Sequence, residues 1–280
     1  MFRKFPIVRL KQLRDYPPYL FFYLRRLLYL KWWSYRYADR YKGFTFLSAS
    51  DSLRYVMDHR LSVIRFGDGE YGQLTGAGEY PPDSDWSQRA SPALMKTLQS
   101  LMCLHDPRIF LAHTPPTIFL ASPKEATAQG LIASMHTEVR MYLWKFLRHD
   151  QVYGHSSLFH PGFHEGFDWK RFFDFLSDKT LVIVTGGVEQ LPNISFGKDV
   201  LFIEVGKHDA FERREQILSD VHDVIKTKHL DPSSTLFLIS LGPTAGYLVK
   251  QLSDEGFIAW DTGHFFKFAH EHWLAYANTR

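Results

Sequence analysis

Two acidic residues, Asp68 and Glu70, stand one residue apart between glycines in the stretch "RFGDGE" at residues 65–70. If a tight turn brings both carboxylates to one point, they repel each other unless one is protonated or a cation lies between them. Mg²⁺ and Mn²⁺ take carboxylate oxygens and keep positions for water and phosphate. The pattern therefore predicts a divalent-metal site, and the alternative is an exposed turn, where Gly and Asp are common.

Three neighbouring residues of the same stretch suit a negatively charged ligand. Arg65 is a charged residue in the otherwise apolar run 61–66, so we expect it to pair with an acid or a phosphate. Gly67 and Gly69 would let a bulky ligand approach the backbone. These three residues are candidate contacts to a phosphate-bearing ligand.

A second candidate phosphate site is the stretch "SLGPTAGYL", in which a predicted strand meets a predicted helix. Pro243 suits the first helical position, Gly242 precedes it and Thr244 adds a hydroxyl, and a free helix N-terminus attracts phosphate. The alternative is an ordinary connection between a strand and a helix. The chain contains neither GxxxxGKS nor GxxxxGKT, which argues against a P-loop kinase or ATPase.

Candidate bases lie in "WDTGHFFKFAHEHW", where Asp261 and His264 follow the last predicted strand and Glu271 comes shortly after. A His beside an Asp can act as a general base, although a single His can also be a hydrogen-bonded structural residue. Another group, His160 and His164, has zinc-like spacing. Proline and glycine between these two histidines argue against a metal-binding helix, so we expect a loop that lines the substrate site.

The elements that would position these residues alternate between apolar strands and helices. This alternation predicts an α/β sandwich, Rossmann-like, with a mostly parallel sheet buried on both faces. Ligands of such sheets bind beyond the carboxyl ends of the strands. Expected strands cover 61–66, 108–113, 179–187, 199–205, 234–240 and 257–261, and expected helices cover 51–60, 92–104, 124–149, 211–228 and 243–255.

Basic charge is concentrated at the N-terminus, where eleven Lys and Arg face two Asp in the first 45 residues. We expect residues 1–46 to form a basic, aromatic-rich helical extension and 47–280 to form the catalytic domain. The extension either packs on that domain or lies on an anionic membrane surface. Its apolar run is too short to span a bilayer. A single cysteine fits a reducing cytosol, so we expect a cytoplasmic protein, peripheral to the inner face of the plasma membrane if the extension binds lipid. No nucleic acid is expected as a partner.

Taken together, these motifs resemble the GT-D fold glycosyltransferases, from bacterial surface-glycan and glycoprotein pathways. The matching stretches are "RFGDGE" at 65–70, "LGPTAGYLVKQLSDEGFIAWDTGH" at 241–264 and, more loosely, "VTGGVEQLPN" and "DVLFIEVGKHDAF". The resemblance covers about residues 50–273. The chain departs from the family pattern after His264, where phenylalanines precede Glu271.

The resemblance implies a metal-dependent hexosyltransferase that uses a nucleoside diphosphate sugar. Asp68 and Glu70 match the family's metal motif, which would hold Mn²⁺ or Mg²⁺ against the diphosphate. A UDP-linked sugar, glucose by family analogy, would be the donor, and the acceptor would be a glycan, a lipid-linked sugar or a glycoprotein. The base stays open among His264, Asp261 and Glu271. The competing classes are a metal-dependent phosphohydrolase or phosphotransferase and a non-catalytic nucleotide-binding domain.

Overall fold

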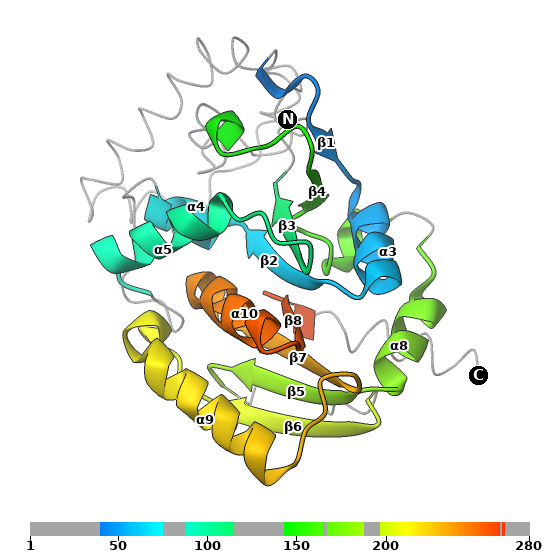
Figure 1. The fold of residues 1–280 in the computed structure, drawn as a ribbon, viewed down its shortest axis with the longest axis vertical. Coiled ribbons are helices and arrows are strands. Elements are labelled where there is room, and N and C mark those ends of the chain that lie inside the picture. Colours follow the sequence, from blue (N-terminus) through cyan, green and yellow to red (C-terminus); the bar gives the residue numbers. More distant parts are fainter. Residues whose placement is uncertain are drawn as a thin grey trace, which may run out of the picture.

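One parallel sheet forms the centre of the molecule (Figure 1). The computed structural model describes residues 40–74, 88–114, 143–164, 167–187, 197–263 and 265–266, without the side chain of Asp68. Within these ranges eight strands pair in the order β1-β4-β3-β2-β8-β7-β5-β6, and every pairing is parallel. The α/β class predicted from the sequence is confirmed. The strands are β1 (Thr45–Phe46), β2 (Ser62–Phe66), β3 (Ile109–His113), β4 (Val152–His155), β5 (Thr180–Thr185), β6 (Asp199–Glu204), β7 (Thr235–Ser240) and β8 (Ile258–Asp261).

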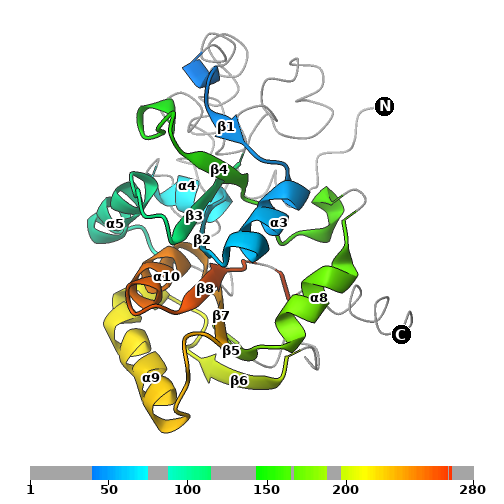
Figure 2. The same cartoon turned by 45° about the vertical axis from the view of Figure 1, so that its right-hand side comes forward.

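Helices cover both faces of this sheet. Figure 2 shows α3 and α8 on one side of the strands and α5, α9 and α10 on the other, which makes a three-layer sandwich. The α-helices of the described ranges are α3 (Ala49–His59), α4 (Asp68–Leu74), α5 (Pro92–Met102), α8 (Trp169–Ser177), α9 (Arg214–Thr227) and α10 (Ala245–Asp254). Short 3₁₀ turns are η4 (Leu143–Lys145), η5 (Pro161–Phe163), η7 (Ala210–Arg213) and η8 (Gly242–Thr244).

Side chains of the central strands alternate between two hydrophobic cores. On β5, Leu181 and Ile183 pack with apolar residues of α3 and α8, whereas Val182 and Val184 pack with residues of α5, α9 and α10. All four side chains are fully buried. A strand buried on both faces is read as a continuous apolar run, which is why β5, β7 and β8 were predictable from the sequence. β6 lies at the edge of the sheet, and Ile203 is its one buried residue, but its apolar residues also predicted a strand.

Local capping explains where the two helices on either side of β2 and α4 begin. The hydroxyl of Ser48 accepts a hydrogen bond from the backbone N–H of Asp51, at 3.0 Å, at the start of α3. The hydroxyl of Ser91 accepts one from Leu94 N, at 3.1 Å, at the start of α5, where Pro92 takes a first-turn position. Helix α3 therefore begins two residues earlier than expected, and α5 begins at the predicted proline.

Two strands and two helices were not expected from the sequence. Strands β1 and β4 are short and carry no continuous apolar run, and β1 includes Thr45 and Phe46 from the predicted extension. Gly154 in β4 is required by packing, because a Cβ there would lie 2.2 Å from the Phe110 ring. Helices α4 and α8 were also not predicted. Most of the helix expected over 124–149 lies outside the described residues.

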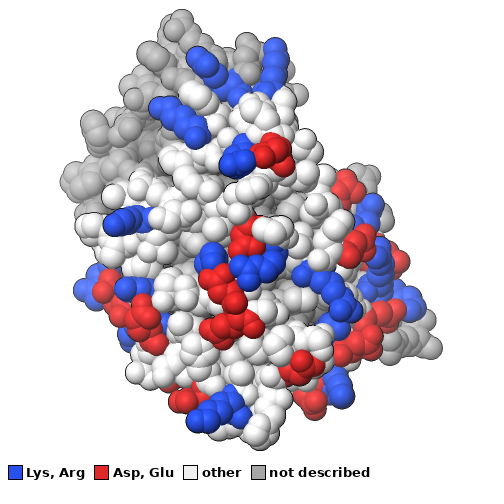
Figure 3. Space-filling view, in the orientation of Figure 1, with Lys and Arg blue, Asp and Glu red and all other residues white. Residues whose placement is uncertain are grey.

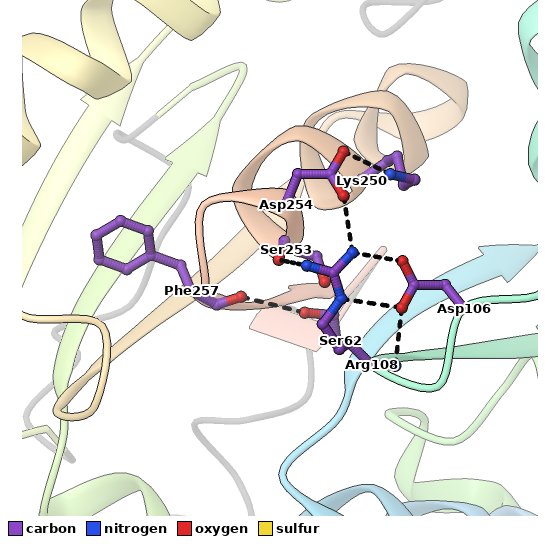
Figure 4. Close-up of polar contacts among 7 residues, drawn as sticks. All are labelled: Ser62, Asp106, Arg108, Lys250, Ser253, Asp254 and Phe257. Carbon is purple, nitrogen blue, oxygen red and sulfur yellow. Dashed lines mark hydrogen bonds and ion pairs between the residues drawn. The ribbon is translucent and has the colours of Figure 1, made fainter.

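A polar cluster fastens the amino end of β3 to the carboxyl end of α10 (Figure 4). The Arg108 guanidinium donates to Asp106 at 2.6 Å, to Asp254 at 2.9 Å and to the carbonyl oxygen of Ser253 at 2.9 Å. Half of the Arg108 side chain is exposed. Because this cluster precedes β3, it lies at the amino edge of the sheet, opposite the edge where ligands of parallel sheets bind.

The surface carries both signs of charge. Figure 3 shows basic and acidic side chains intermixed over the lower part of the face that it draws. Several oppositely charged neighbours contact each other, among them Lys250 with Asp254 and Arg171 with Asp58. Among the described residues, no helix has both the length and the apolar character that a membrane span requires.

Candidate functional site

The carboxyl ends of β2 and β8 bring an arginine and an aspartate together. These strands are neighbours, with Val63 opposite Trp260. The backbone N–H of Arg65 donates to Asp261 Oδ2 at 3.3 Å, and Arg65 Nε lies 3.5 Å from Oδ1. Asp261 is almost fully buried. Burial raises the pKa of the Asp261 carboxyl, and the positive charge of Arg65 opposes that rise.

A second buried carboxylate, Glu70, lies in the helix that follows β2. Its Oε2 accepts a hydrogen bond from the backbone N–H of Gly67 at 2.7 Å. Burial and the negative charge of Asp261 raise the pKa of Glu70 to about 7, whereas Arg65 and the Gly67 N–H lower it. Arg65, Asp261 and Glu70 therefore form one electrostatic unit, with two acids and a single arginine charge.

A glycine makes room for this arginine. Gly263 has φ +52°, which favours glycine, and a Cβ at this position would lie 2.1 Å from Arg65 Nη2. Arg65 Nη1 also donates to the carbonyl oxygen of Ser156 at 2.7 Å. The guanidinium is thus fixed between the segment after β8 and the segment after β4.

The second predicted phosphate motif lies beside the first, because helix α4 packs against the turn η8. Gly242 has φ +51° and is exposed. Pro243 and Thr244 are buried, and the hydroxyl of Thr244 donates to Gln88 Oε1 at 3.4 Å. The exposed part of this turn is therefore the backbone at Gly242, whereas the Thr244 hydroxyl bonds within the protein, and its expected contact with a ligand stays a prediction.

The family follows from a comparison with known proteins. A family model described as "Glycosyltransferase GT-D fold" matches residues 63–280, which is more than three quarters of the chain. The chain belongs to this GT-D family. The match begins in β2 and includes both glycine-containing motifs, so it covers the strands that carry the candidate site.

Relatives of this GT-D chain agree with that placement. The "Probable glycosyl transferase Gly" of Streptococcus gordonii is 28% identical over 229 residues, covering 78% of this chain and 31% of its own length. The chain thus spans about a third of the length of that relative.

Two solved structures share the fold. One is described as "The highly conserved domain of unknown function 1792 has a distinct glycosyltransferase fold". It has a TM-score of 0.66 at 21% identity and covers 86% of each chain. A glycosyltransferase from Streptococcus sanguinis has a TM-score of 0.62 at 22% identity and covers 83% of this chain and 85% of its own.

Several predicted site residues cannot be placed in this GT-D chain. His264, Glu271 and the side chain of Asp68 lie outside the described residues. The expectation of a tight turn at residues 67–70 was wrong, because α4 begins at Asp68 and contains Gly69 and Glu70. The helix starts there because Glu70 accepts the N–H of Gly67, the kind of side-chain contact that satisfies free donors at a helix start.

A divalent cation fits the described carboxylates. Glu70 and Asp261 are both buried, and the charge of Asp261 raises the pKa of Glu70, so a cation beside Glu70 would relieve a repulsion. In the described part of the chain, no three His, Cys, Asp or Glu side chains gather as a metal-binding group.

Two residues make polar contacts near this site that the sequence did not predict. Gln88 is buried. Its backbone carbonyl oxygen accepts a hydrogen bond from Gln73 Nε2 at 2.9 Å, and its side-chain Oε1 accepts one from the backbone N–H of Phe211 at 2.9 Å. Nδ1 of His113, at the end of β3, lies 3.2 Å from the hydroxyl oxygen of Tyr71. Burial lowers the pKa of His113 to about 3, so its ring is neutral near pH 7. Both are single polar residues without a pattern around them.

Proposed function

We propose that this chain is a metal-dependent glycosyltransferase that moves a sugar from a nucleoside diphosphate sugar to an acceptor hydroxyl. The observation that carries the proposal is the unit formed by Arg65 and the two buried acids Asp261 and Glu70 at the carboxyl ends of β2 and β8. A GT-D chain with acids and an arginine at this edge has the charges that a metal-bound diphosphate requires. Membership of the family supports the sugar-transfer chemistry.

The chemistry follows from where charge develops. The acceptor oxygen attacks the anomeric carbon, the bond from that carbon to the diphosphate oxygen breaks, and a base takes the acceptor proton. Mn²⁺ or Mg²⁺, when bound, supplies positive charge to the departing diphosphate. Glu70, with Asp68, would hold the cation, and Arg65 and the Gly242 backbone would contact the phosphates.

Asp261 is better suited to positioning than to proton transfer. Its two oxygens accept hydrogen bonds from the backbone N–H groups of Arg65 and Gly263, at 3.3 and 3.2 Å. A carboxylate occupied in this way fixes the Arg65 backbone and side chain. Of the three candidate bases, we therefore propose that His264 or Glu271 takes the acceptor proton. Both residues follow β8 in the sequence, whereas Asp261 is the last residue of that strand.

The finer assignments rest on the family alone. We take UDP as the nucleotide and glucose as the sugar, with a glycan, a lipid-linked sugar or a glycoprotein of a bacterial surface pathway as the acceptor. A place in the cytoplasm, at the inner face of the plasma membrane, would give access to such acceptors through residues 1–45.

The test is a panel of nucleotide sugars with and without Mn²⁺. We expect one donor to raise the melting temperature only with the metal and to release its nucleotide on transfer. Glu70→Gln should lower metal-dependent turnover by at least about a hundredfold, because one metal ligand loses its charge. Asp68→Asn should do the same.

Glu255→Gln is the matched control, since Glu255 is an exposed acid that pairs with His222 at the other end of α10. It should keep full turnover. Unimpaired transfer by both Glu70→Gln and Asp68→Asn would contradict the metal assignment. Metal-dependent cleavage of the donor without any sugar linkage, over a full acceptor panel, would instead favour a phosphohydrolase.

A further inference from the structure

The loop after β4 presents an aromatic ring to solvent. Phe163, the last residue of η5, is 50% exposed. Among the described residues, only Phe202 on the edge strand β6 is a second large hydrophobic residue in the exposed class, at 42%. Single exposed apolar residues are common on proteins. The support and position of the Phe163 ring, rather than its exposure, set it apart from Phe202.

Two histidine rings and a rigid turn hold the Phe163 ring in place. The His155 ring lies 5.3 Å from it and the His160 ring 5.2 Å, the latter edge-on at 88°. His160 Nδ1 accepts from the backbone N–H of Gly162 at 3.1 Å, and the backbone N–H of Phe163 donates to the His160 carbonyl oxygen at 3.1 Å. Pro161 restricts the backbone further. An exposed ring held in this way loses little freedom when a ligand covers it.

The same loop is bonded to the candidate donor site. His155 ends β4, and its Nδ1 accepts from the backbone N–H of Ser157 at 2.9 Å. Between these two residues, the carbonyl oxygen of Ser156 accepts from Arg65 Nη1 at 2.7 Å. The Phe163 ring is thus connected to the arginine that would contact the diphosphate by a ring contact with His155, the peptide link from His155 to Ser156 and one hydrogen bond.

We propose that Phe163 is the stacking platform of the acceptor subsite, where it contacts the apolar face of a pyranose ring. This proposal rests on the proposed function, because an acceptor subsite exists only if the chain transfers a sugar. A pyranose presents C–H groups on its faces and hydroxyls around its rim. An aromatic ring with polar neighbours matches such an amphipathic ligand. His160 borders the ring and is partly exposed, so it would meet the hydroxyls, whereas the buried His155 ring supports Phe163 from within the protein.

The experiment measures binding of three simple acceptor analogues, the methyl β-glycosides of glucose, galactose and N-acetylglucosamine. Saturation-transfer NMR with UDP and Mg²⁺ present gives their affinities, because the diamagnetic Mg²⁺ does not broaden the ligand signals as Mn²⁺ does. We expect at least one glycoside to bind the parent chain, Phe163→Leu to weaken it about tenfold, and Phe163→Trp to keep it within about threefold. Leucine keeps the apolar character but removes the aromatic face, so the pair separates stacking from simple hydrophobicity.

Phe202→Leu is the matched control, because it makes the same change at the other exposed phenylalanine, on a strand at the far edge of the sheet. It should leave glycoside binding unchanged, and all three variants should keep the parent's affinity for UDP with Mn²⁺. A parent that binds UDP with Mn²⁺ but no glycoside, or glycoside binding that survives Phe163→Leu, would overturn the acceptor assignment alone. A parent that binds neither nucleotide nor glycoside would contradict the proposed function itself.

Discussion

Arg65 interacts in different ways with the two buried acids of the candidate site. It contacts Asp261 directly, through its backbone N–H and its guanidinium, whereas it acts on Glu70 only through its charge. Burial and the negative charge of Asp261 raise the pKa of Glu70 to about 7, and the charge of Arg65 offsets only part of this rise. The two acids would therefore have different roles. Asp261 positions the arginine, and Glu70 is the acid that a cation would stabilise.

The buried His113 is expected to make the folded state less stable at acidic pH. Its ring stacks on Phe66 and meets the Tyr153 ring edge-on, in a fully buried position. Burial lowers the pKa of His113 to about 3, whereas an unfolded histidine titrates near about 6.5. Between these values the unfolded state binds more protons, so stability falls as the pH falls. At pH 5 the loss is about 2 kcal/mol.

Urea unfolding of the parent and His113→Gln at pH 7 and pH 5 measures this loss. Glutamine can still bond the Tyr71 hydroxyl but does not titrate, so the variant should lose about 2 kcal/mol less than the parent between the two pH values. Comparing variant with parent cancels the contribution of Glu70, whose raised pKa changes stability in the opposite direction. His222→Gln, at an exposed histidine, is the control. Equal acid sensitivity in parent and His113→Gln would refute the assignment.

At the scale of elements, helix α4 is positioned by polar contacts as well as by packing. Gln73 on α4 donates to the carbonyl oxygen of Gln88, and the side chain of Gln88 accepts from η7 and from Thr244 in η8. Tyr71 on the same helix contacts His113 at the end of β3. Five segments, α4, the segment of Gln88, η7, η8 and β3, are therefore joined through buried hydrogen bonds, which resist small shifts of α4.

Gln88→Met is expected to loosen this arrangement. Methionine has a similar length, but it leaves the Phe211 N–H and the Thr244 hydroxyl without the acceptor they use now. A buried donor without a partner costs about 1–3 kcal/mol, so the free energy of unfolding in urea should drop by that order. Gln216→Met, at an exposed glutamine bonded to Asp220, should change stability by less than about 0.5 kcal/mol. Identical effects of the two substitutions would show that Gln88 has no special role.

At the scale of the whole molecule, the sheet places the site where its strand order changes direction. From β2 the chain continues to β3 and β4 on one side, while β8, β7, β5 and β6 lie on the other. Parallel sheets bind ligands outside the carboxyl ends of the strands at such a point. Arg65 and Asp261 stand at the ends of the two strands that meet there, which accounts for contacts between residues far apart in the chain.

The N-terminal segment carries a separate prediction of membrane binding. Nine of the eleven basic residues of the first 45 precede residue 40, and Tyr41 and β1 belong to the described body, so a truncation should stop at residue 39. In flotation assays, the full chain should bind phosphatidylserine vesicles and release them in high salt, and residues 40–280 should not bind. Neutral phosphatidylcholine vesicles are the control. No binding of the full chain to the anionic vesicles would remove the membrane proposal.

The sequence was most informative where burial acts on both faces of an element. Strands β2, β3, β5, β7 and β8 are short apolar runs of this kind, β6 is an apolar run at the edge of the sheet, and the glycine-containing motifs stand at the ends of β2 and β7, so the class of fold and the edge of the site were predictable. Strands β1 and β4 escaped prediction because a short strand with a glycine or few apolar residues has no periodic signal. The helix at 68–74 escaped because glycine and aspartate favour turns, and packing overrode that preference.

By itself, then, the sequence determined the α/β class, the GT-D motifs and the acids and glycines that belong to them. Only the tertiary structure showed that Arg65 contacts Asp261 and that Gly263 leaves space for the guanidinium. It also showed that Gln88 joins α4 to the turn η8. The physical reason is range. Apolar periodicity reflects what each residue meets locally, whereas these contacts depend on which distant strands become neighbours when the sheet assembles.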